Sequence, residues 1–345
     1  MRLLLSKLYE SVVRIRALLY GRAILPSRSL RNPVISVGNL TVGGTGKTPY
    51  VAFLAELLKK TGYQPIILSR GYGGKAEKST LVVTDGRKLF CGPNDCGDEP
   101  YLLARKLEGV PVVVGRNRFR GGRAIEDQYE RVVHILDDGF QHLKLKRNLD
   151  VLLLDGTDPF GGNRLLPAGR LREPPRALQR ADLVVITRSH LTLDHDLIEL
   201  QIRKWHKRVP ISYFHHDAVA LFDLKSSKSF RLRDFVNRPV LALAAIGNPG
   251  VFLRDLSHYQ LKVVERFLFR DHHIYTQPEL DRVLQRLSQT AAAAVITTEK
   301  DSVRLEKLHF GKGQILVLQI EAKPEDPEQY RNSILDEIEN LPKPH

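Results

Sequence analysis

The segment at residues 33–48, PVISVGNLTVGGTGKT, constrains the fold more than any other stretch of this chain. Residues 34–37 are a short apolar run that predicts a strand, and the glycine-rich sequence after them predicts a loop. The following YVAFLAELLKK has the apolar spacing of a helix. A strand, a glycine loop, Lys-Thr and a helix in this order form the context of a phosphate-binding P-loop. We therefore predict an α/β fold built around a nucleotide-phosphate site.

The residue types of this loop predict how it would contact a nucleotide phosphate and Mg²⁺. Glycines allow backbone N–H groups to surround a phosphate at the positive end of the helix. Lys47 would reach the β- and γ-phosphates, and the Thr48 hydroxyl would ligate Mg²⁺. The general pattern has glycine where this chain has Thr41. An ordinary glycine-rich turn is the alternative, but it does not account for the flanking strand and helix. The predicted nucleotide-binding residues are Thr41, Val42, Gly43, Gly44, Thr45, Gly46, Lys47 and Thr48.

A second signal is the run RVVHILDDGFQH, in which an apolar strand ends at Asp137 and Asp138. Open α/β sheets bind ligands at the carboxyl ends of their strands. Carboxylates in that position, downstream of a P-loop, are typical of a Walker B element, which holds Mg²⁺ directly or through water. We therefore predict that both aspartates serve the metal.

The remaining sequence alternates strands and helices, which predicts a mostly parallel sheet. At 345 residues, two domains are expected. A new strand–turn–helix unit starts at PVLALAAIGNPGVFLRDL, and extended sequence precedes it. We predict a P-loop domain at 31–210, an extended two-stranded linker at 211–239 and a smaller C-terminal α/β domain at 240–345.

The first 30 residues predict a basic amphipathic helix. Residues 1–31 carry seven basic side chains and one acidic one, while the whole chain has a net charge of +14. Leu4, Leu8, Val12, Ile15 and Leu19 recur at helical spacing, and the segment has no apolar run long enough to span a bilayer. Such a helix can lie on an anionic membrane, or it can simply pack on the domain. A nucleic-acid-binding module is not evident, so nucleic acid is not expected as the partner.

Three further segments contain candidate site residues, and each of them has both a functional and a purely structural interpretation. Asp98, at the start of a predicted helix, is either a helix cap or a catalytic carboxylate. The histidines after Asp271 belong either to a catalytic dyad or to a surface turn. A basic loop either neutralises an anionic substrate or is a solvated turn, and it contains Arg164, Arg170, Arg172 and Arg176.

Taken together, these motifs resemble one family, the tetraacyldisaccharide 4′-kinases of Gram-negative bacteria, which act in lipid A biosynthesis. The likeness is carried, in this order, by VGNLTVGGTGKTP, SRGYGG, GDEP, GRNR, LDDGFQH, LLPAGRLREP, RDHHIY and TTEKD. Thr41 departs from the general P-loop pattern but not from that of the family. The resemblance implies transfer of the γ-phosphate of ATP, with Mg²⁺, to the 4′-hydroxyl of a tetraacylated disaccharide 1-phosphate, yielding lipid IV-A.

The resemblance also implies roles for individual residues. Asp98 in GDEP becomes the base that accepts the sugar hydroxyl proton, together with Lys47 in the catalytic set. His272 becomes its dyad partner, with His273 as the alternative, and the second domain must then close over the first. The residues implied for the substrate phosphate or the transition-state charge are Arg116, Arg118, Gln141, Arg170 and Arg172.

An acylated substrate lies in a membrane, so the resemblance also implies where the enzyme works. ATP is available on the cytoplasmic face of the bacterial inner membrane, and we expect a peripheral protein there. The N-terminal helix then becomes its docking element on the anionic surface.

Three other classes of protein share parts of the pattern. An ATPase that positions cargo on membranes has a KGGxGKT loop, but its signature lysine position holds Val42 here. A GTPase would carry NKxD, whereas residues 298–301 read TEKD. A basic nucleic-acid-binding module would predict salt-dependent binding of DNA or RNA. Each of these classes leaves GDEP and DHH without a role.

Overall fold

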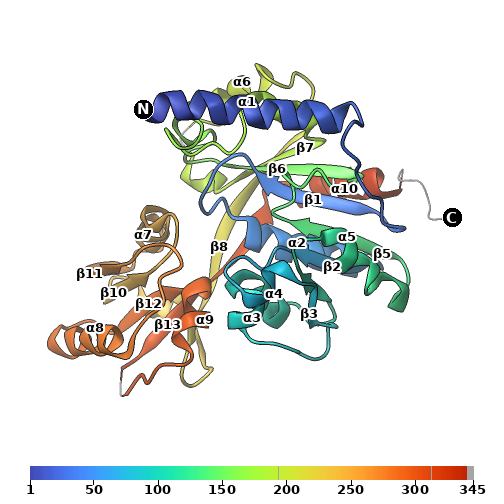
Figure 1. The fold of residues 1–345 in the computed structure, drawn as a ribbon. Coiled ribbons are helices and arrows are strands. Elements are labelled where there is room, and N and C mark those ends of the chain that lie inside the picture. Colours follow the sequence, from blue (N-terminus) through green and yellow to red (C-terminus); the bar gives the residue numbers. More distant parts are fainter. Residues whose placement is uncertain (193, 312, 340–345) are drawn as a thin grey trace. The chain divides into compact units, whose positions relative to one another are not determined.

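The computed structural model describes residues 1–192, 194–311 and 313–339. The chain divides into two compact units (Figure 1). Unit 1 comprises Met1–His216 together with the segment from Ala322 onward, and unit 2 is Asp217–Glu321. The chain therefore passes between the units twice, once within strand β8 and once within strand β13.

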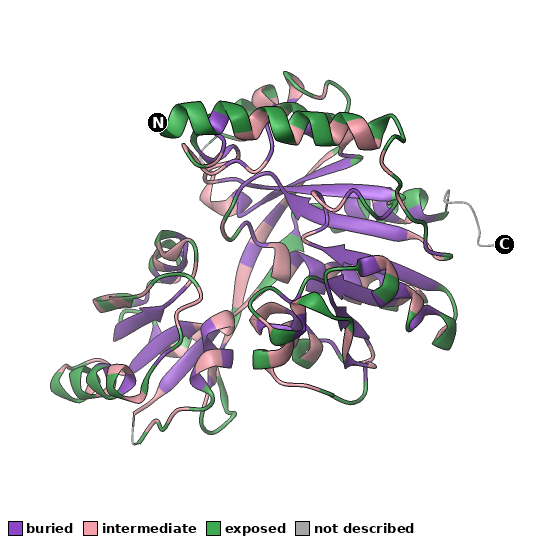
Figure 2. Ribbon diagram, in the orientation of Figure 1, coloured by how far each residue is buried: buried purple, intermediate pink, exposed green. Residues whose placement is uncertain are grey.

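Unit 1 is built on a mostly parallel sheet with the strand order β8-β7-β6-β1-β5-β2-β4-β3, in which β3 runs antiparallel to β4. All six residues of β1 are buried, as expected for a central parallel strand that is covered on both faces (Figure 2). The strands are β1 (Val34–Asn39), β2 (Gln64–Ser69), β3 (Leu81–Thr84), β4 (Val112–Val114), β5 (Val132–Asp137), β6 (Leu149–Asp155), β7 (Leu183–Thr187) and β8 (Ile211–Asp223).

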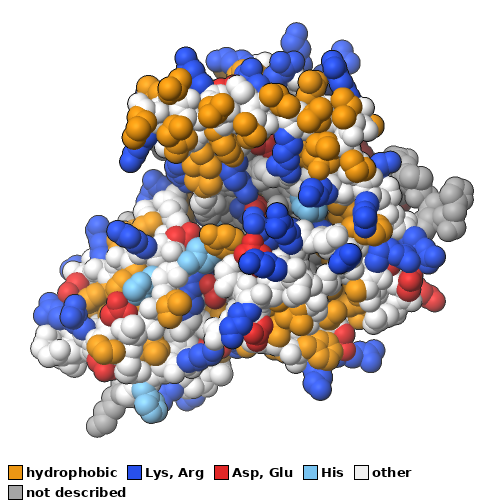
Figure 3. Space-filling model, viewed as in Figure 1, with side chains coloured by type: hydrophobic (Ala, Val, Ile, Leu, Met, Phe, Trp, Pro, Cys, Tyr) orange, Lys and Arg blue, Asp and Glu red, His pale blue; other side chains and the backbone are white. Residues whose placement is uncertain are grey.

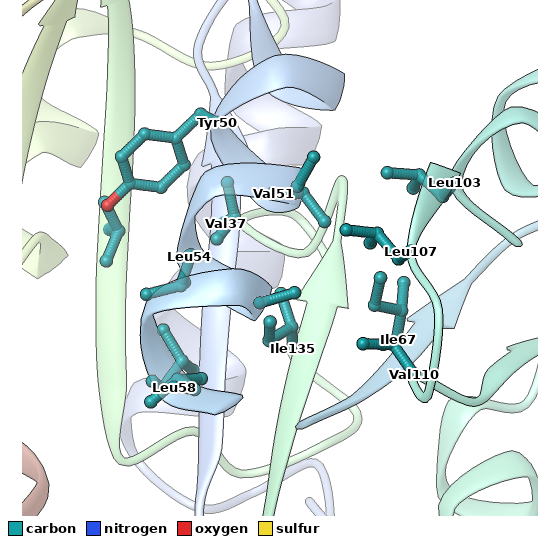
Figure 4. Close-up of a cluster of buried hydrophobic side chains, with 14 of the residues drawn as sticks. Val37, Tyr50, Val51, Leu54, Leu58, Ile67, Leu103, Leu107, Val110 and Ile135 are labelled. Carbon is teal, nitrogen blue, oxygen red and sulfur yellow. The ribbon is translucent and has the colours of Figure 1, made fainter. Parts of the chain in front are cut away.

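Helices of unit 1 bury apolar residues against this sheet. On α2, Tyr50, Leu54 and Leu58 are fully buried in a cluster with residues of β1, β2 and β5 (Figure 4). Ile198 and Ile202 of α6 join a separate cluster, against which Tyr9 of α1 also packs. The helices are α1 (Arg2–Gly21), α2 (Lys47–Lys60), α3 (Pro93–Cys96), α4 (Asp98–Lys106), α5 (Arg118–Arg123), α6 (His195–Arg203) and α10 (Pro327–Glu339).

Unit 2 has the strand order β11-β10-β12-β13, with parallel pairs from β11 to β13. Alternate residues of β10 enter two different apolar clusters, Val240 one and Leu241 the other, as the period of a strand requires. The elements are β9 (Ser229–Phe230), β10 (Pro239–Ala244), α7 (Pro249–His258), β11 (Lys262–Leu268), α8 (Gln277–Gln289), β12 (Ala294–Thr298), α9 (Glu299–Leu305) and β13 (Ile315–Pro324).

The C-terminal segment differs from the predicted domain at 240–345. Tyr330, Ile334 and Ile338 of α10 are buried in the same cluster as α2 of unit 1, and the hydroxyls of Tyr50 and Tyr330 share a hydrogen bond. This helix belongs to unit 1 because its apolar face completes the core beside α2. None of the described helices combines the length and apolar character needed to cross a membrane.

Candidate functional site

The site lies where several parallel strands of unit 1 end. The predicted P-loop follows β1, Asp137 is the last residue of β5, and β6 and β7 end at Asp155 and Thr187. Register places Val37 of β1 directly opposite Asp137. Polar residues from distant parts of the sequence therefore meet at one edge of the sheet, the position at which open α/β sheets bind ligands.

The P-loop has the backbone conformation that its glycines allow. Gly43 has φ 108° and Gly46 has φ 76°, both in a region that residues with a side chain rarely adopt. Gly46 is the residue before α2, so the helix begins at Lys47, earlier than the apolar spacing alone indicates. The Lys47 ammonium lies 3.3 Å from Asn39 Oδ1 and 3.5 Å from Asp138 Oδ1. The loop therefore places its lysine beside the predicted metal carboxylate.

Asp137 and Asp138 have opposite electrostatic environments. Burial would raise the pKa of Asp138, but Lys47 and Arg172 outweigh it and hold that pKa well below its ordinary value. Arg172 donates to both carboxylate oxygens of Asp138, at 2.9 Å and 2.8 Å. Burial raises the pKa of Asp137 to about 6, and the charges of Glu99 and Asp138 add to the effect. Asp138 is thus a fixed anion, while Asp137 is held by a 2.9 Å hydrogen bond from Ser69.

The predicted substrate-binding residues lie in four different settings. Gln141 Nε2 donates to the Asn39 carbonyl at 3.0 Å, in the same network as Arg172. Burial lowers the pKa of Arg118 to about 10, against the opposing charges of the two aspartates. Arg170 donates to Val42 O at 3.2 Å and pairs with Asp158 at 3.3 Å. Arg116 is exposed.

Asn39 is a central residue of the site that the sequence analysis did not single out. Its amide nitrogen donates to Thr41 O at 2.9 Å, and its Oδ1 accepts hydrogen bonds from Lys47 and Arg172. The signal in the sequence was a polar residue at the end of an apolar strand, directly before the loop. Arg188 and Asp155, described below, were also not identified.

Asp98 is the first residue of α4 and is half-buried. The residue before the helix is Gly97, with φ 89°, so Asp98 does not occupy the capping position. A Cβ on Gly97 would lie 2.6 Å from Tyr72 O, and one on Gly74 would lie 2.6 Å from Gly97 N. The SRGYGG and GDEP motifs therefore pack backbone against backbone, which needs glycine on both sides.

The two histidines of the DHH run have different neighbours in unit 2. His272, with φ 61°, lies 3.4 Å from Lys300 Nζ and 3.3 Å from Arg304 Nη2. His273 binds Glu279 at 3.0 Å, and its ring stacks on Phe269. Both histidines are thus engaged within unit 2, and His272 stays the predicted dyad residue with His273 as the alternative. Because Asp98 is in unit 1 and His272 in unit 2, their pairing stays a prediction.

The TTEKD motif contributes Lys300, which contacts His272, and a buried aspartate nearby. Asp301 is fully buried and accepts hydrogen bonds from Thr298 Oγ1 at 2.7 Å, Tyr275 OH at 3.1 Å and Ala245 N at 3.1 Å. This carboxylate fixes the start of α9, the helix that carries Lys300. The motif therefore has a structural role within unit 2.

Helix α1 lies against the site with a polar face and leaves an apolar face exposed (Figure 3). Ser6 Oγ donates to Leu165 O at 2.9 Å, Tyr9 OH to Arg172 O at 3.0 Å, and Arg16 Nη2 to Gln141 O at 2.8 Å. The exposed apolar side chains of the helix are Leu3, Leu4, Leu5, Leu8, Val12, Ile15 and Leu18. One face of the helix therefore packs on unit 1, while its docking on a membrane stays a prediction.

The chain is similar to known proteins over almost its whole length. The family model for tetraacyldisaccharide-1-P 4′-kinase matches residues 2–339. The tetraacyldisaccharide 4′-kinase of Pelobacter propionicus is 42% identical over 300 residues, 87% of this chain and 81% of the relative. That of Geobacter metallireducens is 38% identical over 330 residues, 96% and 95% of the two chains.

Among solved structures, the fold is similar to the crystal structure of LpxK from Aquifex aeolicus in complex with ATP. The TM-score is 0.76 at 34% sequence identity, and the match covers 97% of each chain. The resemblance inferred from the sequence motifs is thereby confirmed. The chain belongs to the tetraacyldisaccharide-1-P 4′-kinase family.

Proposed function

We propose that unit 1 binds ATP in its P-loop and transfers the γ-phosphate to the 4′-hydroxyl of a tetraacyldisaccharide 1-phosphate, which yields lipid IV-A. Membership of the family makes this chain a kinase of lipid A biosynthesis. The observation that carries the site assignment is the convergence of Lys47, Asp138 and Arg172 around Asn39 at the mouth of the P-loop.

The P-loop fits a nucleotide phosphate in its backbone and in one side chain. Residues 45–48 stand at the N-terminal end of α2, where N–H groups and the helix dipole favour an anion. The Thr45 hydroxyl oxygen is buried and has no hydrogen-bond partner among the residues that the structure describes. A buried hydroxyl without a partner is costly, and a bound phosphate oxygen would supply one. Lys47 would add its charge to the β- and γ-phosphates.

Thr48, Asp137 and Asp138 are the residues that would hold Mg²⁺. Their oxygen atoms suit a hard divalent cation, and the two carboxylates stand at the end of β5, the neighbour of β1. Mg²⁺ held there would neutralise charge on the phosphates. The guanidinium of Arg172 now occupies both oxygens of Asp138, so this arginine would share the carboxylate or turn toward the substrate.

In the proposed reaction, Asp98 accepts the proton of the 4′-hydroxyl as the sugar oxygen bonds to the γ-phosphorus. The bond from that phosphorus to the β–γ bridging oxygen breaks, and its electron pair leaves with ADP. His272 would orient the Asp98 carboxylate, with the linker formed by β8 and β13 allowing the units to close. Arg116, Arg118, Gln141, Arg170 and Arg172 supply donors for the 1-phosphate or for the charge of the transferring group.

A phosphoryl-transfer assay in detergent micelles tests this assignment with γ-labelled ATP, Mg²⁺ and tetraacyldisaccharide 1-phosphate. We expect Asp98→Asn to lower kcat by about 10²–10⁴-fold, the range of general-base catalysis, with ATP affinity near that of the wild type. Lys47→Met should weaken both ATP binding and turnover. Asp95→Asn, a half-buried carboxylate three residues before Asp98, is the matched control and should keep wild-type activity.

Two results would contradict the proposal. Equal loss of ATP affinity in Asp98→Asn and Lys47→Met would make Asp98 a metal or structural residue. Release of free phosphate by the wild type without labelled lipid would favour the membrane-associated ATPase.

The exposed apolar face of α1 suits the peripheral docking of this enzyme on the cytoplasmic face of the inner membrane. Its leucines would enter the interface, while the basic residues along the helix attract anionic lipid. We expect removal of residues 1–25, or the single change Val12→Asp, to reduce flotation with anionic liposomes. Val264→Asp in unit 2 changes a comparably exposed valine, 46% against 57%, and should float as the wild type does. Full flotation without residues 1–25 would refute the role of α1.

A further inference from the structure

The carbonyl groups of the P-loop are held from outside the loop by side chains. Asn39 donates to Thr41 O at 2.9 Å, and Arg170 to Val42 O at 3.2 Å. Arg188 Nη1 donates to Gly44 O at 3.0 Å, and Thr187 Oγ1 to Thr45 O at 2.9 Å. Because these four groups come from β1, from β7 and the residue directly after it, and from the basic loop, the loop conformation is fixed by the surrounding protein as well as by its own glycines.

The geometry of a peptide group predicts where the N–H groups of the same peptides point. A trans peptide is planar, so the carbonyl of one residue and the N–H of the next point in opposite directions. The Gly44 and Thr45 carbonyls face Arg188 and Thr187. The N–H groups of Thr45 and Gly46 must therefore point away from these side chains, toward the side on which a phosphate would bind.

Arg188 is itself held firmly. Its Nη1 lies 2.6 Å from Asp155 Oδ2, and the two side chains are 10% and 5% exposed. The other oxygen of Asp155 accepts hydrogen bonds from Thr157, through the backbone N–H at 3.1 Å and the hydroxyl at 2.8 Å. Arg188 also has φ 55°, which residues with a side chain adopt at a cost. A buried ion pair in a strained position is a poor source of stability and suggests another role.

We propose that Arg188, fixed by Asp155, is a positioning residue that holds the P-loop in its phosphate-binding conformation before the nucleotide arrives. This inference rests on the proposed function, in that the P-loop is taken to bind ATP. Without the guanidinium, the Gly44–Thr45 peptide is free to rotate, and ATP must then restore its orientation on binding. Such ordering reduces affinity, and it affects ground state and transition state alike.

The expected signature is therefore a change in ATP affinity with little change in turnover. Arg188→Met keeps the length of the side chain and removes its charge, and we expect it to raise the Kd and KM for ATP by about tenfold or more, with kcat changed by less than about threefold. Arg188→Lys, which keeps a cation, should recover most of the affinity. Thr187→Val, a nearly isosteric change at the neighbouring carbonyl, should weaken ATP binding in the same direction.

The matched control is the ion pair at the other end of β6. Arg147 and Asp150 are 2.7 Å apart, and both side chains are 10% exposed. Arg147→Met should lower the Tm much as Arg188→Met does, yet leave the Kd for ATP unchanged. Calorimetric titration of the full-length protein with ATP and Mg²⁺, together with thermal unfolding, measures both quantities for each variant.

The outcomes separate this inference from the proposed function. Wild-type protein that binds no ATP would refute the proposed function itself. Wild-type affinity in Arg188→Met, or equal loss of affinity in Arg188→Met and Arg147→Met, would overturn the role of Arg188 and leave the kinase assignment in place. If Arg188→Met does not fold, Arg188→Lys and Thr187→Val decide the question, since wild-type affinity in Thr187→Val would overturn the carbonyl-holding argument.

Discussion

His134 lies in the middle of β5, fully buried, with its Nε2 3.9 Å from a carboxylate oxygen of Glu126. Burial lowers the pKa of His134 to about 4, and the charge of Glu126 opposes only part of that effect. Glu126 is already paired with Arg123 at 2.8 Å. The imidazole is therefore neutral in the folded protein at neutral pH.

Protonation of this histidine makes the stability of unit 1 depend on pH. The unfolded chain binds a proton near pH 6.5, whereas the folded chain does so only near pH 4. Between these values the unfolded state holds more protons, so the free energy of unfolding falls as pH falls, by at most about 1.4 kcal/mol per pH unit. We expect His134→Gln to reduce this slope in urea titrations at pH 7, 6 and 5. Part of the slope should remain, because burial also lowers the pKa of His142, to about 3. Identical slopes in the two proteins would contradict the prediction.

Individual site residues were predictable where a motif fixes their chemistry. Lys47, Asp138 and Arg172 were identified as candidates, and the structure brings them together. Asn39 and Arg188 were not, because each also donates to a backbone carbonyl of the loop, Thr41 O and Gly44 O respectively. Any suitably placed donor can make such a contact, so it leaves no pattern of residue types in the sequence.

At the scale of elements, α10 and α2 form the most informative pair. The Tyr50 and Tyr330 rings meet edge to face with centroids 6.4 Å apart, and their hydroxyls are hydrogen-bonded to each other. Both residues are fully buried or nearly so, and Phe214 packs against both rings. The C-terminal helix thus supports the helix that begins at the P-loop.

This pair predicts a non-additive response to mutation. Tyr330→Phe leaves the Tyr50 hydroxyl buried without that partner and should cost about 1–3 kcal/mol of unfolding free energy, as should Tyr50→Phe. The double variant removes both hydroxyls and should cost less than the sum of the two single changes. Denaturant unfolding of the four proteins completes the cycle. Additive effects would show that the hydroxyls do not depend on each other.

Whether a segment is a strand or a helix was easier to predict than the elements against which it packs. The strand before the P-loop and the helix after it follow from local apolar spacing, and the structure has both, as β1 and α2. The position of α10 depends on contact between residues about 280 positions apart, such as Tyr50 and Tyr330. An amphipathic pattern states that a helix has an apolar face but not which sheet it covers.

At the scale of the whole molecule, the α/β class and the mostly parallel sheet were predictable from the alternation of strands and helices. The division of the chain into two units was harder to predict. The predicted C-terminal domain reached residue 345, whereas the chain returns to unit 1 at Ala322. Composition changes little across that point, because the same strand, β13, continues through it.

The return of the chain to unit 1 at Ala322 determines which unit is completed first during translation. Everything in unit 2 has been translated once Glu321 is added, whereas unit 1 still lacks α10. Since chains emerge from the ribosome N-terminus first, the P-loop segment waits through nearly the whole of translation for Tyr330, Ile334 and Ile338 to cover it. A nascent chain stalled before α10 therefore exposes apolar surface beside the proposed nucleotide site, which is the kind of surface that chaperones bind.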